Sequence, residues 1–153
     1  VVRDSDQLAR AQRLGVQHVL LGDDPDLSRH IRELSPDGVH RIAEVDFASH
    51  VNLDADILAI GGVISSFSSS AARPAIPYWD LGFKDATLRL LGSDDFSAAV
   101  KATAAQALTD ALVTGDLRAD IAERVPLEEI ASAHELVESG APGRVVIDVV
   151  ANG

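Results

Sequence analysis

The segment VHRIAEVDFASHVNLDADILAIGGVISSF, residues 39–67, decides the fold of this chain. Its first seven residues, 39–45, form a short, largely apolar run that is typical of a strand. In the stretch 51–60, apolar residues at positions 53, 57 and 60 have helical spacing, and Gly61-Gly62 predicts a helix stop. Residues 63–67 again have the composition of a strand. This order predicts a βαβ unit with two parallel strands.

The same alternation extends to both sides of the segment. Further strands are predicted over residues 16–21, 87–91, 120–125 and 145–150. Further helices are predicted to begin at the polar clusters 4–6, 23–26 and 93–95 and at Pro126. We therefore predict an α/β fold, a Rossmann-like and mostly parallel sheet flanked by helices.

Composition excludes several classes of protein. The 153 residues include 13 Lys+Arg and 24 Asp+Glu, a formal net charge of −11, and 46% are hydrophobic. A chain this apolar is not disordered, and no apolar run reaches the length that crosses a membrane. The absence of Cys excludes a disulfide framework and a thiolate zinc site, and we predict no bound metal. The acidity argues against a nucleic-acid partner and fits a cytoplasmic protein.

Six strings carry a family resemblance. They are ARAQRLG (9–15), IAEVDF (42–47), LAIGGVI (58–64), FKDATLR (83–89), PLEEIASAHE (126–135) and GRVVIDV (143–149). In order and spacing, they resemble the cofactor-binding half of the medium-chain dehydrogenase/reductase superfamily. Within it, the zinc-independent quinone oxidoreductase (zeta-crystallin-like) branch is the most similar.

The resemblance implies a domain organisation. Residues 1–118 would be a nucleotide-binding domain that lacks its first βα unit, including the glycine-rich turn that cradles phosphate. Residues 119–153 would be a segment that returns to the catalytic domain. The chain begins Val1-Val2-Arg3 and contains no Met, so we expect a fragment. We expect it to be inactive alone and weak in cofactor binding, with its catalytic residues upstream and unknown.

The predicted cofactor site lies where parallel strands end, because open α/β sheets bind ligands at that edge. By resemblance, the residues along the nicotinamide and its ribose are Val45, Asp46, Ser66, Phe67, Ser68, Leu91 and Gly92. Two plainer interpretations stay open: Glu44 and Asp46 simply face solvent, and 65–70 is a flexible polar loop. Tyr78 and Trp79 could line a substrate mouth or cover a dimer interface.

Arg3 bears on the choice of cofactor. The position that selects NAD when it is acidic corresponds to Val2, and Arg3 follows it. A guanidinium matches the oxygens of a 2′-phosphate, which favours NADPH. Asp4 and Asp6 lie close by, so NADH remains an alternative, as does a purely solvated Arg3.

By resemblance, the whole enzyme would transfer a hydride from NADPH to a small molecule, a quinone or an activated alkene or carbonyl. The alternatives are a fragment of a zinc-dependent alcohol dehydrogenase relative and a non-enzymatic, Rossmann-like dimerisation module. A homodimer through the edge strand Thr87 to Leu91 is also expected, because an open edge tends to pair.

Overall fold

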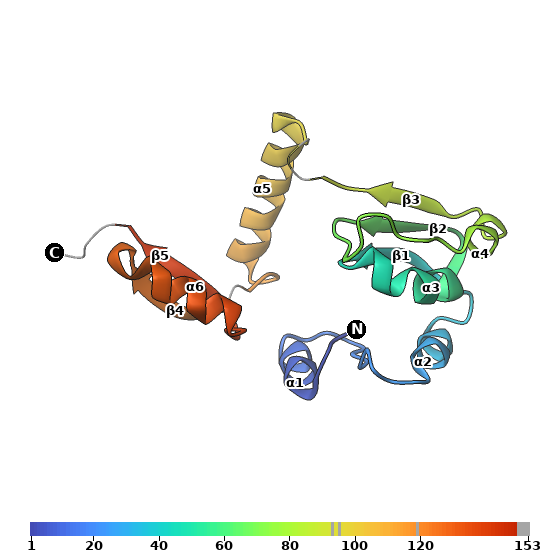
Figure 1. Ribbon diagram of the computed structural model, residues 1–153, viewed down its shortest axis with the longest axis horizontal. Coiled ribbons are helices and arrows are strands. Elements are labelled where there is room, and N and C mark those ends of the chain that lie inside the picture. The colour runs from blue at the N-terminus through green and yellow to red at the C-terminus, as the bar shows by residue number, and fades with distance from the viewer. Residues whose placement is uncertain (93, 95, 119, 150–153) are drawn as a thin grey trace. The chain divides into compact units, whose positions relative to one another are not determined.

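The segment that decides the fold forms the expected βαβ unit. Strand β1 (Val39–Glu44) leads into helix α3 (Phe47–Ile57), and strand β2 (Leu58–Ser66) follows directly. The two strands pair in parallel, and β3 (Thr87–Leu90) adds a third parallel strand on the other side of β2. The predicted α/β fold with parallel strands is confirmed (Figure 1).

The computed structural model describes residues 1–92, 94, 96–118 and 120–149. It divides into two units, Val1–Asp95 and Phe96–Gly153. The boundary expected after residue 118 lies inside the second unit, between helix α5 (Ala98–Thr114) and strand β4 (Ile121–Pro126). No helix in the described part of the chain is long and apolar enough to span a membrane.

Helix α3 covers one face of the three-stranded sheet. Phe47, Val51 and Ala55 recur every four residues, so their side chains lie on one face of the helix. They pack against Ile64 of β2, which has no exposed surface, and against Leu81. This core fixes α3 beneath the strands and so determines where the strand ends lie.

The predicted boundaries of α3 and β2 were wrong. The helix begins at Phe47 rather than near residue 51, and Ile60 belongs to β2, where it is 78% exposed. Gly61 and Gly62 do not end a helix. They occupy an irregularity in the β1–β2 register, which passes from Val39↔Leu58 to Arg41↔Val63. Because a bulge and a helix stop both favour glycine, the sequence alone did not distinguish them.

Helices and irregular segments make up the remainder of the first unit. Helices α1 (Ser5–Arg13) and α2 (Leu27–Leu34) form as predicted. The strand expected over 16–21 is absent: among the described residues, it pairs only through an isolated parallel bridge between Leu21 and Val2. A strand needs a neighbouring ladder, which local composition cannot supply. The short helix α4 (Tyr78–Gly82) lies between β2 and β3, where the sequence pattern predicted no helix.

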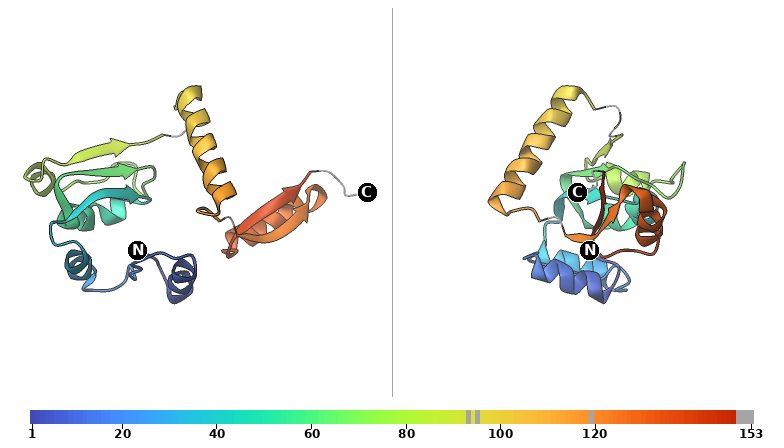
Figure 2. Two further views of the ribbon diagram at one scale, coloured as in Figure 1. Left: turned by 180° about the vertical axis from the view of Figure 1, so that it is seen from behind. Right: turned by 90° about the vertical axis from the view of Figure 1, so that its left-hand side faces the viewer.

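The second unit contains one long helix and a small parallel sheet. Strands β4 (Ile121–Pro126) and β5 (Arg144–Asp148) pair in parallel, and α6 (Ile130–Glu138) packs against both (Figure 2). A 3-10 turn, η2 (Leu127–Glu129), precedes α6. Helix α5 (Ala98–Thr114) has no buried residue. Its N-cap is Ser97, whereas the predicted cap residues 93 and 95 and the predicted strand end at 150 lie outside the described residues.

Candidate functional site

The three parallel strands of the first unit end side by side. Glu44 of β1 is in register with Ser66 of β2, and Ser66 is in register with Leu90 of β3. The chain therefore leaves all three strands at one edge of the sheet. This edge is where an open parallel sheet binds ligands.

A cavity of about 590 Å³ lies at this edge. Its wall includes five of the residues predicted from the sequence, together with Phe47 and several apolar residues that follow β2. The five are Ser66, Phe67, Ser68, Leu91 and Gly92. The structure thus brings these predicted residues into one wall.

The segment after β2, residues 67–71, is called the serine loop below. Its attachment to the start of α3 shapes the cavity. The backbone N–H of Phe47 donates to the carbonyl of Ser68 at 3.1 Å, and the hydroxyl of Ser66 donates to the same carbonyl at 3.0 Å. These bonds make the loop part of the cavity wall.

Asp46 ties the serine loop from outside the cavity. One of its carboxylate oxygens accepts the backbone N–H of Ser70 at 2.7 Å, and the other accepts the hydroxyl of Ser49 at 2.7 Å. The Ser49 hydroxyl, followed by the Ser70 amide, lowers the pKa of Asp46 to about 2. Asp46 and its neighbour Val45, which is 57% exposed, do not line the cavity. Both adjoin it through the connection from β1 to α3.

A cluster of ionisable groups lies beneath that connection. Glu44 is only 6% exposed, and its carboxylate accepts the backbone N–H of Asp46 and bonds Nδ1 of His50 at 2.9 Å. Asp54, one helical turn after His50, is 3% exposed. Burial, reinforced by the negative charge of Glu44, raises the pKa of Asp54 to about 7. The open question about Glu44 is thereby answered: it is buried rather than facing solvent.

Sequence reasoning missed Asp54, although a signal was present. Asp54 stands seven residues after Phe47 and three after Val51, on the helix face that carries the core. A carboxylate at such a position is unusual, because its burial costs free energy unless it is paired or protonated. The misplaced start of α3 concealed this.

Arg3 was predicted to contact the 2′-phosphate of the cofactor. Its backbone N–H donates to the side chain of Gln7 at 3.1 Å, and Asp4 caps α1 by accepting the N–H of Gln7 at 2.8 Å. The Arg3 side chain is exposed and forms no ion pair with any residue that the structure describes. It does not line the cavity.

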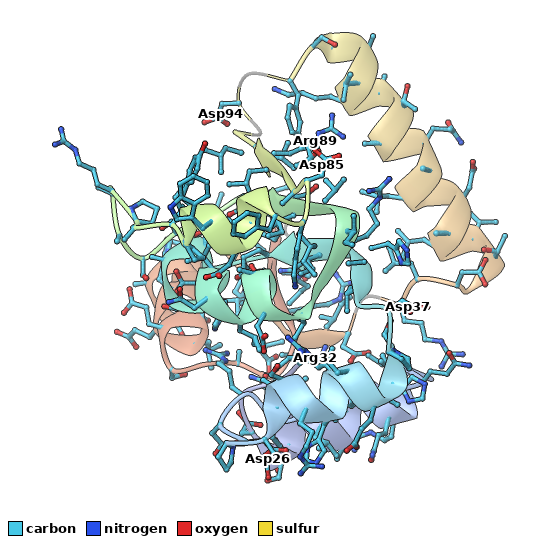
Figure 3. The ribbon with its side chains drawn as sticks, turned by 90° about the vertical axis from the view of Figure 1, so that its right-hand side faces the viewer. Asp26, Arg32, Asp37, Asp85, Arg89 and Asp94 are labelled. Atoms are coloured by element: carbon cyan, nitrogen blue, oxygen red, sulfur yellow. The ribbon has the colours of Figure 1, made fainter. Side chains whose placement is uncertain are left out.

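A second cavity of about 610 Å³, beside α2, is not supported as a site by its chemistry. Its arginines are already paired: Arg29 with Asp26 and Glu33, and Arg32 with Asp56. Figure 3 labels Asp26 and Arg32 at this helix. With its positive charge neutralised within the protein, the cavity offers little attraction to an anionic ligand.

Comparison with known proteins identifies the family. Residues 14–147 match the family described as zinc-binding dehydrogenase, which covers most of the chain. The chain therefore belongs to this family, within the medium-chain dehydrogenase/reductase superfamily expected from its sequence. No curated protein is similar enough to the chain to match it.

Solved structures share the fold. A 2-haloacrylate reductase superimposes with a TM-score of 0.86 at 21% identity, over 98% of this chain and 49% of that one. A quinone oxidoreductase of Pseudomonas syringae pv. Tomato DC3000 gives 0.78 at 20% identity, over 97% and 47%. A mycobacterial protein complexed with NADPH gives 0.77 at 21%, over 95% and 47%. The chain spans less than half the length of each of these proteins.

The family description implies zinc, which the residues of this chain do not fit. The sequence contains no Cys, and the described residues include no group of three His, Asp or Glu side chains that could hold a metal ion. Glu44 and His50 bond each other directly. We therefore assign no step to zinc in this chain.

Proposed function

We propose that this chain is the cofactor-binding part of an oxidoreductase that transfers a hydride from NADPH to a quinone or to an activated alkene or carbonyl. The observation that carries the proposal is the cavity at the ends of β2 and β3, because open α/β sheets bind ligands there. The reductase and quinone oxidoreductase that share the fold support the substrate class. The relative complexed with NADPH supports the cofactor.

The wall of the cavity suits a nicotinamide ring. Phe67 is 58% exposed and offers an aromatic surface against which a planar ring can pack. Ser66 and Ser68 add polar groups to the lining, and Leu91 and Gly92 complete it. NADPH supplies the hydride, while these residues orient the ring and keep water from it.

The neighbouring predicted residues have supporting roles in this proposal. Val45 and Asp46 flank the ribose from the β1–α3 connection, and Arg3 recognises the 2′-phosphate. We also propose that β3 forms the interface of a homodimer. The alternative of a zinc-dependent alcohol dehydrogenase relative retains the same nicotinamide site and differs in ligands that this chain does not provide.

Binding of reduced nicotinamide mononucleotide, the reactive half of the cofactor, tests the site directly. We expect weak but saturable binding to the ¹⁵N-labelled chain, on the order of millimolar. The amide resonances that shift should be those of residues 66–68 and 91–92. Replacing Phe67 with Ala should weaken binding roughly fivefold, because an aromatic contact contributes about 1 kcal/mol.

Phe83 provides the matched control. It is also exposed, at 80%, and stacks on Trp79 with ring centroids 5.7 Å apart, but it does not line the cavity. The Phe83→Ala variant should bind the mononucleotide as the unchanged chain does. Shifts confined to other regions, or equal losses in the two variants, would contradict the proposed site.

A further inference from the structure

We infer that Glu44, His50 and Asp54 form one electrostatically coupled cluster, whose protonation state sets how firmly the serine loop is held against the cavity. The first side chain comes from the end of β1 and the other two from successive turns of α3. The inference goes beyond the proposed function because it concerns the protein without a ligand. It therefore does not depend on which molecule binds in the cavity.

Glu44 connects the cluster to the cavity wall at two points. Its carboxylate accepts the backbone N–H of Asp46, whose own carboxylate holds Ser70 of the serine loop. Its backbone carbonyl accepts the N–H of Phe67 at 3.2 Å. A displacement of Glu44 would therefore disturb the serine loop at two points, at Phe67 directly and at Ser70 through Asp46.

Asp54 is the group whose charge the fold does not accommodate. Its Oδ2 atom is buried and has no hydrogen-bond partner among the described residues. An ionised carboxylate in that position lacks the compensation that burial requires. Asp54 is also close enough to Glu44 for their like charges to interact, whereas His50 acts in the opposite direction. The favoured state of the cluster is a neutral Asp54 beside a Glu44–His50 ion pair.

Among the residues that the structure describes, no charged group on the elements packed on α3 neutralises Asp54. The elements packed on α3 are β1, β2, α2 and α4, and β2 has no ionisable side chain. Arg32 pairs with Asp56, and the Lys84 ammonium donates to the carbonyls of Ala55 and Asp56 at 2.6 Å each. The remaining ionisable side chains on these elements are exposed or take part in other contacts: Arg29, His30, Glu33, His40, Arg41, Tyr78 and Asp80.

The direction of the pH effect follows from both groups. The pKa of Asp54 is raised to about 7, so the carboxyl gains its charge as the pH passes through neutrality. The hydrogen bond to Glu44 raises the pKa of His50, so its cation is lost as the pH rises through that raised value. Both changes add net negative charge around Glu44. The loop attachment should therefore loosen with increasing pH.

Amide hydrogen exchange of the full ¹⁵N-labelled chain without ligand tests this inference. Protection factors, which remove the intrinsic pH dependence of exchange, should fall for the N–H groups of Asp46, Phe67 and Ser70. We expect a fall of roughly tenfold between about pH 6 and pH 8, equivalent to one pKa unit of coupling. The N–H of Gly61, which donates to the carbonyl of Lys84 at 2.7 Å, should keep its protection.

Two variants distinguish an effect of the cluster from the effect of removing any carboxylate from α3. In Asp54→Asn the three amides should remain protected at pH 8, whereas Asp56→Asn, on the exposed side of the same helix, should retain the pH-dependent fall. Carboxyl ¹³C titration of the unchanged chain gives an independent measurement that needs no variant. A pKa for Asp54 near that of a free carboxyl, constant protection across the range, or an unchanged fall in Asp54→Asn would overturn the inference.

Discussion

Asp46 holds the cavity wall through charge, and its charge persists over the pH range in which the cluster beneath it titrates. The pKa of Asp46 is lowered to about 2 from a reference value of 3.8. Ionised Asp46 therefore contributes its full stabilisation of the fold above its pKa in the unfolded chain. This contribution is lost only as the pH falls through its lower pKa in the folded protein. The Asp46 carboxylate that accepts the bonds from Ser49 and Ser70 thus remains ionised near neutrality. A pH-dependent change in the attachment of the serine loop at that pH must therefore originate at Glu44 and the groups around it.

Arg3 should determine the preference for a 2′-phosphate. Adenosine 2′-monophosphate, compared with adenosine 5′-monophosphate, isolates this contact from the rest of the cofactor. We expect Arg3→Ala to weaken binding of the 2′-phosphate roughly fivefold and to leave the 5′-compound unaffected. The expected loss is about 1 kcal/mol, since an exposed guanidinium is screened by water. Titration calorimetry or NMR measures both affinities.

Arg13, at the last turn of α1, is the control for this experiment. It carries the same charge on the helix that follows Arg3, so Arg13→Ala changes the net charge equally. An equal loss in both variants would show a general electrostatic effect. An unchanged preference in Arg3→Ala would remove Arg3 from the site.

At the scale of elements, the irregular start of β2 depends on glycine. Gly61 has a φ of +71°, a conformation that a side chain disfavours by roughly 1–2 kcal/mol. At Gly62, an added Cβ would lie 2.8 Å from the carbonyl oxygen of Ala59. We predict that Gly61→Ala lowers the free energy of unfolding by about 1–2 kcal/mol, measured by urea denaturation.

Gly82 in α4 shows what the same substitution does without backbone strain. Its φ is not in the left-handed region, and an added Cβ meets no atom within 4 Å. Gly82→Ala should therefore be neutral or stabilising by up to about 1 kcal/mol. Equal destabilisation by the two substitutions would show that the conformation of β2 is not the cause.

Helices and strands could be predicted where a local sequence pattern determines them. The prediction failed where strand pairing or the exact start of a helix determines the structure. The end of β3 and residues 66–68 could be placed together because parallel strands finish at one edge. In the described parts of the chain, the segment 16–21 has only Val2 as a partner, and no local pattern reveals this. Counting Ile60 in the helical stripe displaced α3 and hid the burial of Asp54. The residues that contact the cavity were therefore more predictable than the ionisable cluster that supports them.

At the scale of the molecule, the first unit has an unpaired sheet edge. In the part of the chain that the structure describes, β3 pairs only with β2. An open edge presents unpaired N–H and C=O groups and favours association with another strand. A second copy of the same strand provides a twofold solution, because the interface is then self-complementary. The edge thus offers a specific place to test the proposed homodimer.

Leu90 is the position at which that test is sharpest. The N–H of Leu91 donates to the carbonyl of Ser66 in β2 at 2.8 Å, so the preceding N–H, that of Leu90, points to the open edge. Leu90→Pro removes this donor while the bond from Leu91 to β2 can remain.

Light scattering should give a dimer for the unchanged chain and a monomer for Leu90→Pro. Leu90→Ala removes the 76% exposed side chain but keeps the N–H, and it should remain dimeric. A monomer in the unchanged chain at high concentration, or a dimer that survives the proline, would exclude this edge as the interface.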